Sequence, residues 1–112
     1  HPFKKSCPFI IIQLLYDKFD VDHFIPWSFI KDDNLWNLVL SCPTCNRKKN
    51  DRLPDGKFLT DIIDRNQHIL IEFHRPEMQN YQSRMISYVY NWAKINGYDR
   101  TWQPDTKVVL AK

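Results

Sequence analysis

The sequence predicts an α+β fold: an antiparallel pair of strands, a short helix, and two longer helices packed around them. Residues 19–23 alternate apolar and polar side chains, which is typical of a strand with one buried face. A second strand is expected over 35–40, after the Asp-Asp-Asn turn at 32–34. From residue 58 onward, apolar residues recur at helical spacing. This order of elements indicates a single mixed domain.

Two segments flank or follow the predicted hairpin. Residues 9–16 are too apolar to face water on any side. Pro8 suits the first turn of a short buried helix there, whereas the β-branched residues suit a strand, so both interpretations stay open. After the second strand, Ser41 is a suitable N-cap and Pro43 a suitable first-turn residue for a helix over roughly 43–50.

The hairpin unit ends in a Leu-Pro-Asp-Gly turn at 53–56. A helix is expected over 58–70, because its apolar residues share one face that only Asn66 interrupts. A longer amphipathic helix follows Pro76 and stops at Asn96-Gly97. Its apolar face consists of Tyr81, Met85, Tyr88, Val89, Trp92 and Ile95. We expect both helices to be a scaffold for the hairpin unit.

Aromatic residues are numerous, with four Trp, five Tyr and seven Phe. Each can bury about 150–250 Å², so most are expected in the core. Trp27, Phe29 and Trp36 could in principle stack on nucleic-acid bases. We expect them instead to be core residues that brace the two strands.

The bulk composition is that of a folded domain. The chain has 112 residues, of which 43% are hydrophobic and 26% charged. A net charge of +3 permits nucleic-acid binding without indicating it. With no signal peptide and no run of about 18 apolar residues, we expect a cytoplasmic protein without a membrane partner. Because the chain begins at His1 rather than Met, we expect one domain over 1–112 that is part of a longer protein.

Side chains suited to phosphodiester hydrolysis concentrate between the first strand and the short helix. An imidazole, as in His23, can take a proton from water near neutral pH. A carboxylate and an amide oxygen, as in Asp22 and Asn46, can hold a hard cation such as Mg²⁺. Cations on and beyond the same helix could bind a phosphate backbone. These cations are Arg47, Lys48, Lys49 and Arg52.

This pattern resembles the HNH endonuclease family, whose nuclease unit is the ββα-metal (His-Me finger) fold. The resemblance covers about residues 19–54. It is carried by the pair Asp22-His23, by Asn37 fourteen residues after the histidine, and by a CxxC motif followed at once by Asn46. The wider sequence resembles a bacterial subgroup whose members often lie at the ends of larger restriction or phage-defence proteins. The resemblance implies other domains of a larger parent protein as partners.

The family resemblance also implies residue roles. His23 would be the general base, Asp22 and Asn46 the metal ligands, and Asn37 the residue that ties the loop down and orients the base. The metal would stabilise charge on the leaving 3′-oxygen during DNA cleavage, with RNA left open as a substrate. An Asn at position 46 favours Mg²⁺ or Mn²⁺ over Zn²⁺.

The cysteines depart from the family pattern. Many relatives close a structural zinc site with two CxxC motifs, but here only Cys7 stands where the first motif would be, against Cys42 and Cys45 of the second. A histidine could complete a Cys₃His site, although we favour the absence of structural zinc. Two alternative functions stay open: a non-catalytic zinc-binding module that binds nucleic acid, and an inactive HNH interaction domain.

Overall fold

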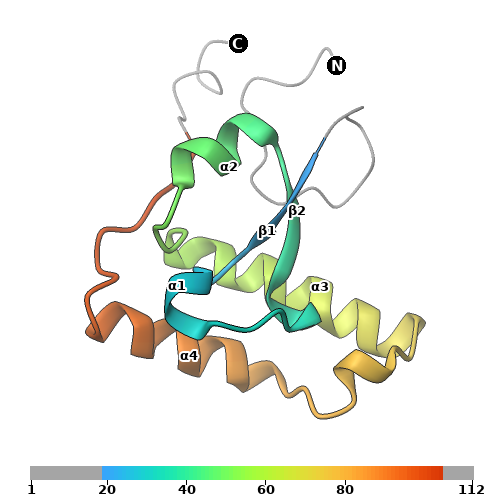
Figure 1. Cartoon of the computed structure of the whole chain (residues 1–112). Coiled ribbons are helices and arrows are strands. Elements are labelled where there is room, and N and C mark those ends of the chain that lie inside the picture. Colours follow the sequence, from blue (N-terminus) through green and yellow to red (C-terminus); the bar gives the residue numbers. More distant parts are fainter. Residues whose placement is uncertain (1–18, 105–112) are drawn as a thin grey trace.

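The computed structural model describes residues 19–104, and every structural statement below refers to this part of the chain. Its sheet has two antiparallel strands, β1 (Asp20–His23) and β2 (Leu38–Ser41). Asp22 lies opposite Val39 in the register. The expected hairpin is therefore present, and the predicted α+β fold class is confirmed (Figure 1). The open question about residues 9–16 falls outside the described residues.

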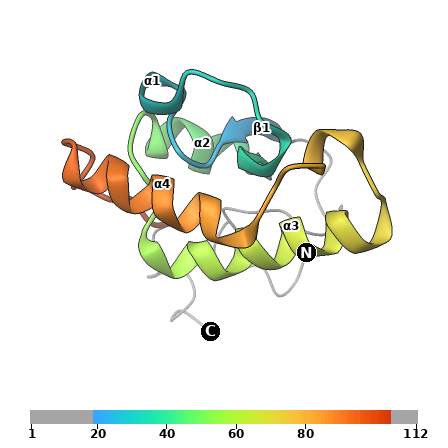
Figure 2. The same cartoon turned by 90° about the horizontal axis from the view of Figure 1, so that it is seen from below.

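Three helices follow the hairpin: α2 (Pro43–Lys49), α3 (Leu59–Glu72) and α4 (Ser83–Ile95). Figure 1 shows α2 at the far end of the hairpin from α4. Helices α3 and α4 run side by side in opposite directions, as the view from below shows (Figure 2). Both were expected from helical spacing of apolar residues. The predicted apolar face of α4 is wrong in part, because Tyr88, Trp92 and Ile95 are exposed. The buried residues of this helix are Ile86, Tyr90 and Ala93. None of the helices in the described part is long and apolar enough to cross a membrane.

The second strand is shorter than predicted. Residues Leu35–Asn37 form a single 3₁₀ turn, and the strand begins only at Leu38. The reason is that Asn37 is fully buried and its side chain bonds the backbone of the loop after β1 instead of extending along a ladder. Two other 3₁₀ turns, Gly56–Phe58 and Pro76–Met78, precede α3 and α4.

The predicted N-cap of α2 is wrong by one residue. Ser41 is the last residue of β2, and Cys42 occupies the cap position, followed by Pro43 in the first turn. The Ser41 side chain is buried, and its hydroxyl has no hydrogen-bond partner among the described residues. Ser41 pairs with Asp20 in the register of the sheet, and its buried hydroxyl does not cap α2.

A core of apolar side chains lies where the hairpin, α3 and α4 meet. Its fully buried members include Phe24, Ile25, Leu53, Ile62, Met78, Ile86 and Tyr90. Trp36 is buried as expected, whereas Trp27 is 50% exposed, so the prediction of a core role for Trp27 is wrong. Trp27 opens the four-residue helix α1 (Trp27–Ile30), which has no buried residue and was not predicted. Phe29 is half-buried and packs edge-on against Trp92 and Tyr98.

The segment after α4 returns to the exit of α2. Trp102 forms a parallel bridge with Pro54, in which its amide donates to the Leu53 carbonyl at 2.8 Å and its carbonyl accepts from Asp55 at 2.7 Å. The Tyr90 hydroxyl of α4 donates to the Pro54 carbonyl. Residues 53–55 are thus held by two segments that lie far away in the sequence.

Candidate active site

Helix α2 lies across β1, and two pairs of side chains join them. Asp20 and Asp22 share one face of the strand, because alternate strand residues point the same way. Asn46 Nδ2 donates to Asp20 Oδ2 at 2.9 Å, and Lys49 Nζ lies 3.3 Å from Asp22 Oδ2. Helix residues three apart are also surface neighbours. Two acidic residues that lie two positions apart on β1 therefore face two residues that lie three positions apart on α2. These two contacts fix α2 on the acidic face of β1.

His23 ends β1 and contacts a carboxylate of the following loop. Its Nε2 lies 2.7 Å from Asp33 Oδ1, and its side chain is 27% exposed. An ionised carboxylate only accepts hydrogen bonds, so this contact fits the tautomer with hydrogen on Nε2. That tautomer leaves Nδ1 as a proton acceptor. The His23 carbonyl accepts from Lys49 Nζ at 3.1 Å, which ties the end of the strand to α2.

Asn37 clamps the loop that follows His23. Its side-chain Oδ1 accepts from the Ile25 amide at 2.8 Å, its Nδ2 donates to the Ile25 carbonyl at 2.9 Å, and its own carbonyl accepts from Phe24 at 2.8 Å. All three bonds reach the two residues directly after His23. The side chain is completely buried, where such bonds are costly to lose. The backbone next to the histidine is consequently held in one geometry.

Asp22 sits in a mostly buried setting. Its Oδ1 accepts from the His23 amide at 2.8 Å, whereas its buried Oδ2 has no well-aligned hydrogen bond from a described residue. Burial raises the pKa of Asp22 above its usual value, and the nearby Lys49 ammonium opposes that shift. Burial likewise lowers the pKa of Lys49, with Asp22 opposing. The ammonium at 3.3 Å acts on Oδ2 as an ion pair rather than as a directed donor.

These donor groups fit a hard divalent cation. Asp22 offers a carboxylate oxygen without a directed hydrogen bond, and Asn46 keeps its amide oxygen for a ligand because its Nδ2 is used by Asp20. Carboxylate and amide oxygens are the ligand types that Mg²⁺ takes, usually with several waters. The described residues contain no group of three or more His, Cys, Asp or Glu side chains that could hold a metal. A site here would therefore rest on two protein oxygens.

The cations beyond Asn46 divide into two kinds. Arg47, Lys48 and Arg52 are exposed, and so they are available to an external phosphate. Lys49 is only 1% exposed and faces Asp22 and the His23 carbonyl. The prediction that Lys49 contacts nucleic acid is wrong, because its position on α2 points it into the β1 interface instead of solvent.

Cys42 and Cys45 are both buried at the start of α2. Cys7, the third cysteine of the predicted set, lies outside the described residues. A structural zinc site therefore stays a prediction, as does its absence. The two buried thiols pack at the interface between the hairpin and the helix.

Two acidic residues of the site escaped the sequence analysis. Asp20 could have been found, because it lies two positions before Asp22 and must share its strand face. Asp33 gave no signal beyond that of a turn former. Its contact with His23 joins residues ten apart through the path of the loop, which periodicity does not report.

Parts of this sequence match known proteins. Residues 9–55 match the family model described as HNH endonuclease. Over 36 residues, 32% of this chain, the sequence is 47% identical to the CRISPR-associated endonuclease Cas9 of Listeria innocua serovar 6a. Over 70 residues, 62% of this chain, it is 31% identical to the CRISPR-associated endonuclease Cas9 of Streptococcus mutans serotype c. These stretches are 3% and 4% of the two relatives' own lengths. No solved structure matches the chain significantly.

Proposed function

We propose that this chain, whose residues 9–55 match the HNH endonuclease family, is the nuclease unit of a longer protein. In this proposal it hydrolyses DNA phosphodiester bonds with a divalent metal ion. The match to small parts of two CRISPR-associated endonucleases supports a larger, phage-defence parent protein. The observation that carries the proposal is the junction of β1 and α2. There His23 contacts Asp33 of the following loop. Asp22 pairs with Lys49, and Asn46 bonds Asp20, so each of the three groups is held by a neighbouring side chain.

His23 is the general base of the proposed reaction. Its contact with Asp33 fixes the ring and, in the Nε2–H tautomer, leaves Nδ1 to take the proton of the attacking water. As the ring becomes imidazolium, the Asp33 carboxylate stabilises the new positive charge. Asn37 supports the base indirectly, because it holds the backbone of the next two residues. Asn37 is therefore a positioning residue.

Asp22 and Asn46 are the proposed ligands of Mg²⁺ or Mn²⁺. When bound, the metal ion stabilises the negative charge that develops on the leaving 3′-oxygen. Lys49 keeps the Asp22 carboxylate oriented through its ammonium at 3.3 Å. The exposed cations Arg47, Lys48 and Arg52 bind the phosphate backbone in this scheme.

Cleavage of supercoiled plasmid tests the proposed function. The 112-residue chain is incubated with Mg²⁺, Mn²⁺ or EDTA, in parallel with His23→Ala and with His68→Ala, which alters an exposed histidine on α3. We expect metal-dependent nicking that falls by about 10²–10⁴ in His23→Ala and is unchanged in His68→Ala. Asp33→Asn should lose a smaller factor, roughly tenfold, because the base is retained but less well oriented.

Full activity in His23→Ala would contradict the assignment of the base. If neither DNA nor RNA is cut with any metal, although thermal melting shows a folded chain, the nuclease proposal is wrong. A non-catalytic binding unit would then be the better description of this chain.

A further inference from the structure

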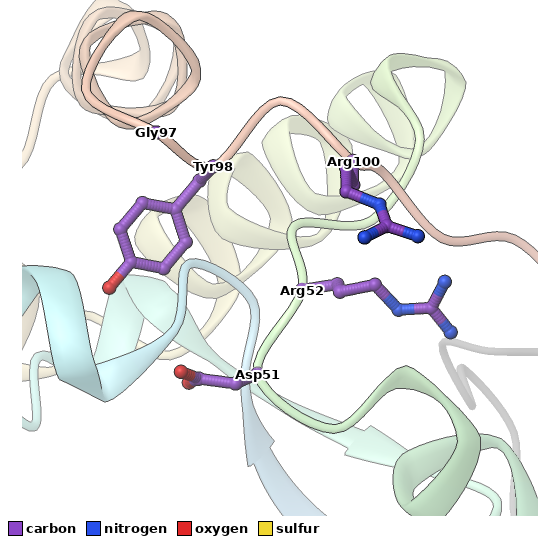
Figure 3. A pocket seen from close by; sticks show the side chains of 5 residues that line it. All are labelled: Asp51, Arg52, Gly97, Tyr98 and Arg100. Atoms are coloured by element: carbon purple, nitrogen blue, oxygen red, sulfur yellow. The ribbon is translucent and has the colours of Figure 1, made fainter.

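A pocket of about 460 Å³ opens beside the exit of α2, and none of the residues that line it is a proposed metal ligand. It is lined by Asp51, Arg52, Gly97, Tyr98 and Arg100 (Figure 3). Its residues come from two segments more than forty positions apart. Two of the five are arginines that are both exposed to solvent. A concave surface with two guanidinium groups is suited to an anion.

Arg52 is held in place before any ligand arrives. Its guanidinium donates to the Lys48 carbonyl at 2.8 Å and to the Lys49 carbonyl at 3.5 Å, so it covers the end of α2. These bonds use only some of the five N–H donors of an arginine. The rest stay available to a ligand, and the cost in side-chain entropy of binding is reduced.

Arg100 reaches the same pocket because the chain on either side of Arg100 is bound to the rest of the protein. Tyr98 donates its amide to the Ala93 carbonyl and its hydroxyl contacts Ser28 at 2.7 Å. Two residues after Arg100, Trp102 is buried and bridges Pro54. Arg100 is therefore placed next to Arg52 by the tertiary structure and not by a flexible tail.

The acid of the pocket does not neutralise these arginines. Both Asp51 carboxylate oxygens accept from the Ser28 hydroxyl, at 2.9 and 3.0 Å. Figure 3 shows the Asp51 carboxylate and the Tyr98 hydroxyl on one side of the pocket and both guanidinium groups on the other. Within the described residues, neither arginine forms an ion pair. Two like charges on one wall repel each other unless an anion lies between them.

We propose that Arg52 and Arg100 form a clamp for a backbone phosphate of the nucleic acid. The inference rests on the proposed function and deepens it, since it adds Arg100 from outside the matched HNH segment. The clamp lies just past Lys49, the residue that contacts Asp22, so it binds the strand beside the proposed site of cleavage. A phosphate contact carries no base preference, so the clamp would bind any sequence equally.

Fluorescence anisotropy with a labelled DNA duplex tests the clamp. Binding is measured in EDTA, where a metal-dependent nuclease does not cut, for the wild-type chain, Arg52→Gln, Arg100→Gln and the double variant. Arg84→Gln is the matched control, since Arg84 is an exposed arginine at the start of α4, outside this pocket. Each measurement is repeated at salt concentrations from about 25 to 200 mM. Over roughly this range, added salt strongly weakens binding that depends on phosphate contacts.

We expect Arg100→Gln to weaken binding roughly fivefold for every duplex sequence and to reduce the salt slope by about one. Because both arginines hold one phosphate, the double variant should lose less than the product of the two single losses. Arg84→Gln should bind as the wild type does. Arg52→Lys keeps the positive charge but not the planar guanidinium. An affinity between those of the wild type and Arg52→Gln would show how much the two-pronged contact of the guanidinium contributes.

Three results would overturn the clamp. Arg100→Gln could bind within twofold of the wild type with an unchanged salt slope. The two single losses could multiply in the double variant, which indicates two separate contacts. Arg84→Gln could weaken binding as much as Arg100→Gln, which indicates a general charge effect. After any of these three results, the proposed function still holds if the chain nicks DNA with metal and His23→Ala does not. If the chain neither binds nor cuts DNA, both proposals are wrong.

Discussion

A single buried lysine joins the parts of the candidate site. Lys49 Nζ contacts both the Asp22 carboxylate and the His23 carbonyl, at 3.3 and 3.1 Å. It lies on α2 three residues after Asn46, so one helical turn presents an amide to Asp20 and an ammonium to Asp22 of β1. A buried charge pair of this kind is costly to form and more costly to break on one side only.

Removing the Lys49 charge should destabilise the protein strongly. In Lys49→Met, the Asp22 carboxylate stays largely buried without its counter-ion, so we expect the free energy of unfolding to fall by about 3–5 kcal/mol. Urea unfolding monitored by circular dichroism measures this loss. Lys48→Met, which alters an exposed neighbour on α2, should change the stability by less than about 0.5 kcal/mol.

The double variant Asp22→Asn/Lys49→Met separates charge from packing. It should recover a large part of the loss, because the unpaired carboxylate is gone. If the double variant is as unstable as Lys49→Met, the ion pair is not the cause of the effect.

At the scale of elements, two buried asparagines hold the 3₁₀ turn Leu35–Asn37 in place. Asn37 bonds the loop after β1, and Asn66 of α3 donates to the Trp36 carbonyl at 2.8 Å and to the Tyr81 hydroxyl at 3.3 Å. In the sequence, Asn66 looked like a break in an apolar face. In the structure it is completely buried and fastens α3 to the turn that supports the base.

Loss of the Asn66 amide should weaken this connection. Asn66→Leu keeps a similar size but leaves the Trp36 carbonyl buried without its donor, so we expect a loss of about 1–3 kcal/mol in the free energy of unfolding. Urea unfolding measures it, with Gln67→Leu on the exposed side of α3 as the control. Equal stability of Asn66→Leu and the wild type would mean that the turn does not depend on this bond.

At the scale of the whole molecule, the exit of α2 is where distant parts of the chain meet. Tyr90 of α4 donates to the Pro54 carbonyl, and Trp102 pairs with the backbone on both sides of Pro54. Burial, together with the charge of nearby Asp55, raises the pKa of Tyr90 to about 12 from 10.0. The neutral phenol is therefore the form that the folded protein favours.

This shift predicts a loss of stability in alkali. Between pH 10 and 12 the folded protein holds a proton that the unfolded chain releases, so unfolding becomes easier as the pH rises. The contribution is complete below pH 10 and should fall by roughly 2 kcal/mol by pH 12. Urea unfolding at pH 8, 10 and 11.5 measures it.

Tyr90→Phe should remove this part of the pH dependence while costing about 1 kcal/mol at pH 8 through the lost hydrogen bond. Tyr88→Phe is the control, because Tyr88 is 71% exposed on the same helix. A wild-type curve parallel to that of Tyr90→Phe would show that the buried phenol does not titrate with folding.

Local order in the sequence was sufficient for the outline of the fold and for the family. Alternation predicted β1, and helical spacing predicted α3 and α4, since local spacing reports the kind of element. It did not identify the buried face, because Val21 of β1 is exposed, as are Tyr88, Trp92 and Ile95 of α4. The order of Asp22, His23, Asn37 and Asn46 indicated the HNH resemblance that the family match over residues 9–55 confirms. These features depend on residues close together in the chain, and so the sequence alone determined them.

The tertiary structure decided which charges are buried and which distant residues meet. Lys49 and Lys48 are alike in sequence, but only Lys49 lies against β1, because a helical step of about 100° separates neighbouring side chains. The contact of Asp33 with His23 depends on a loop path, and the place of Arg100 beside Arg52 depends on the bridge between Pro54 and Trp102. Packing between separate segments sets such contacts, and the spacing of residues within one segment does not encode them.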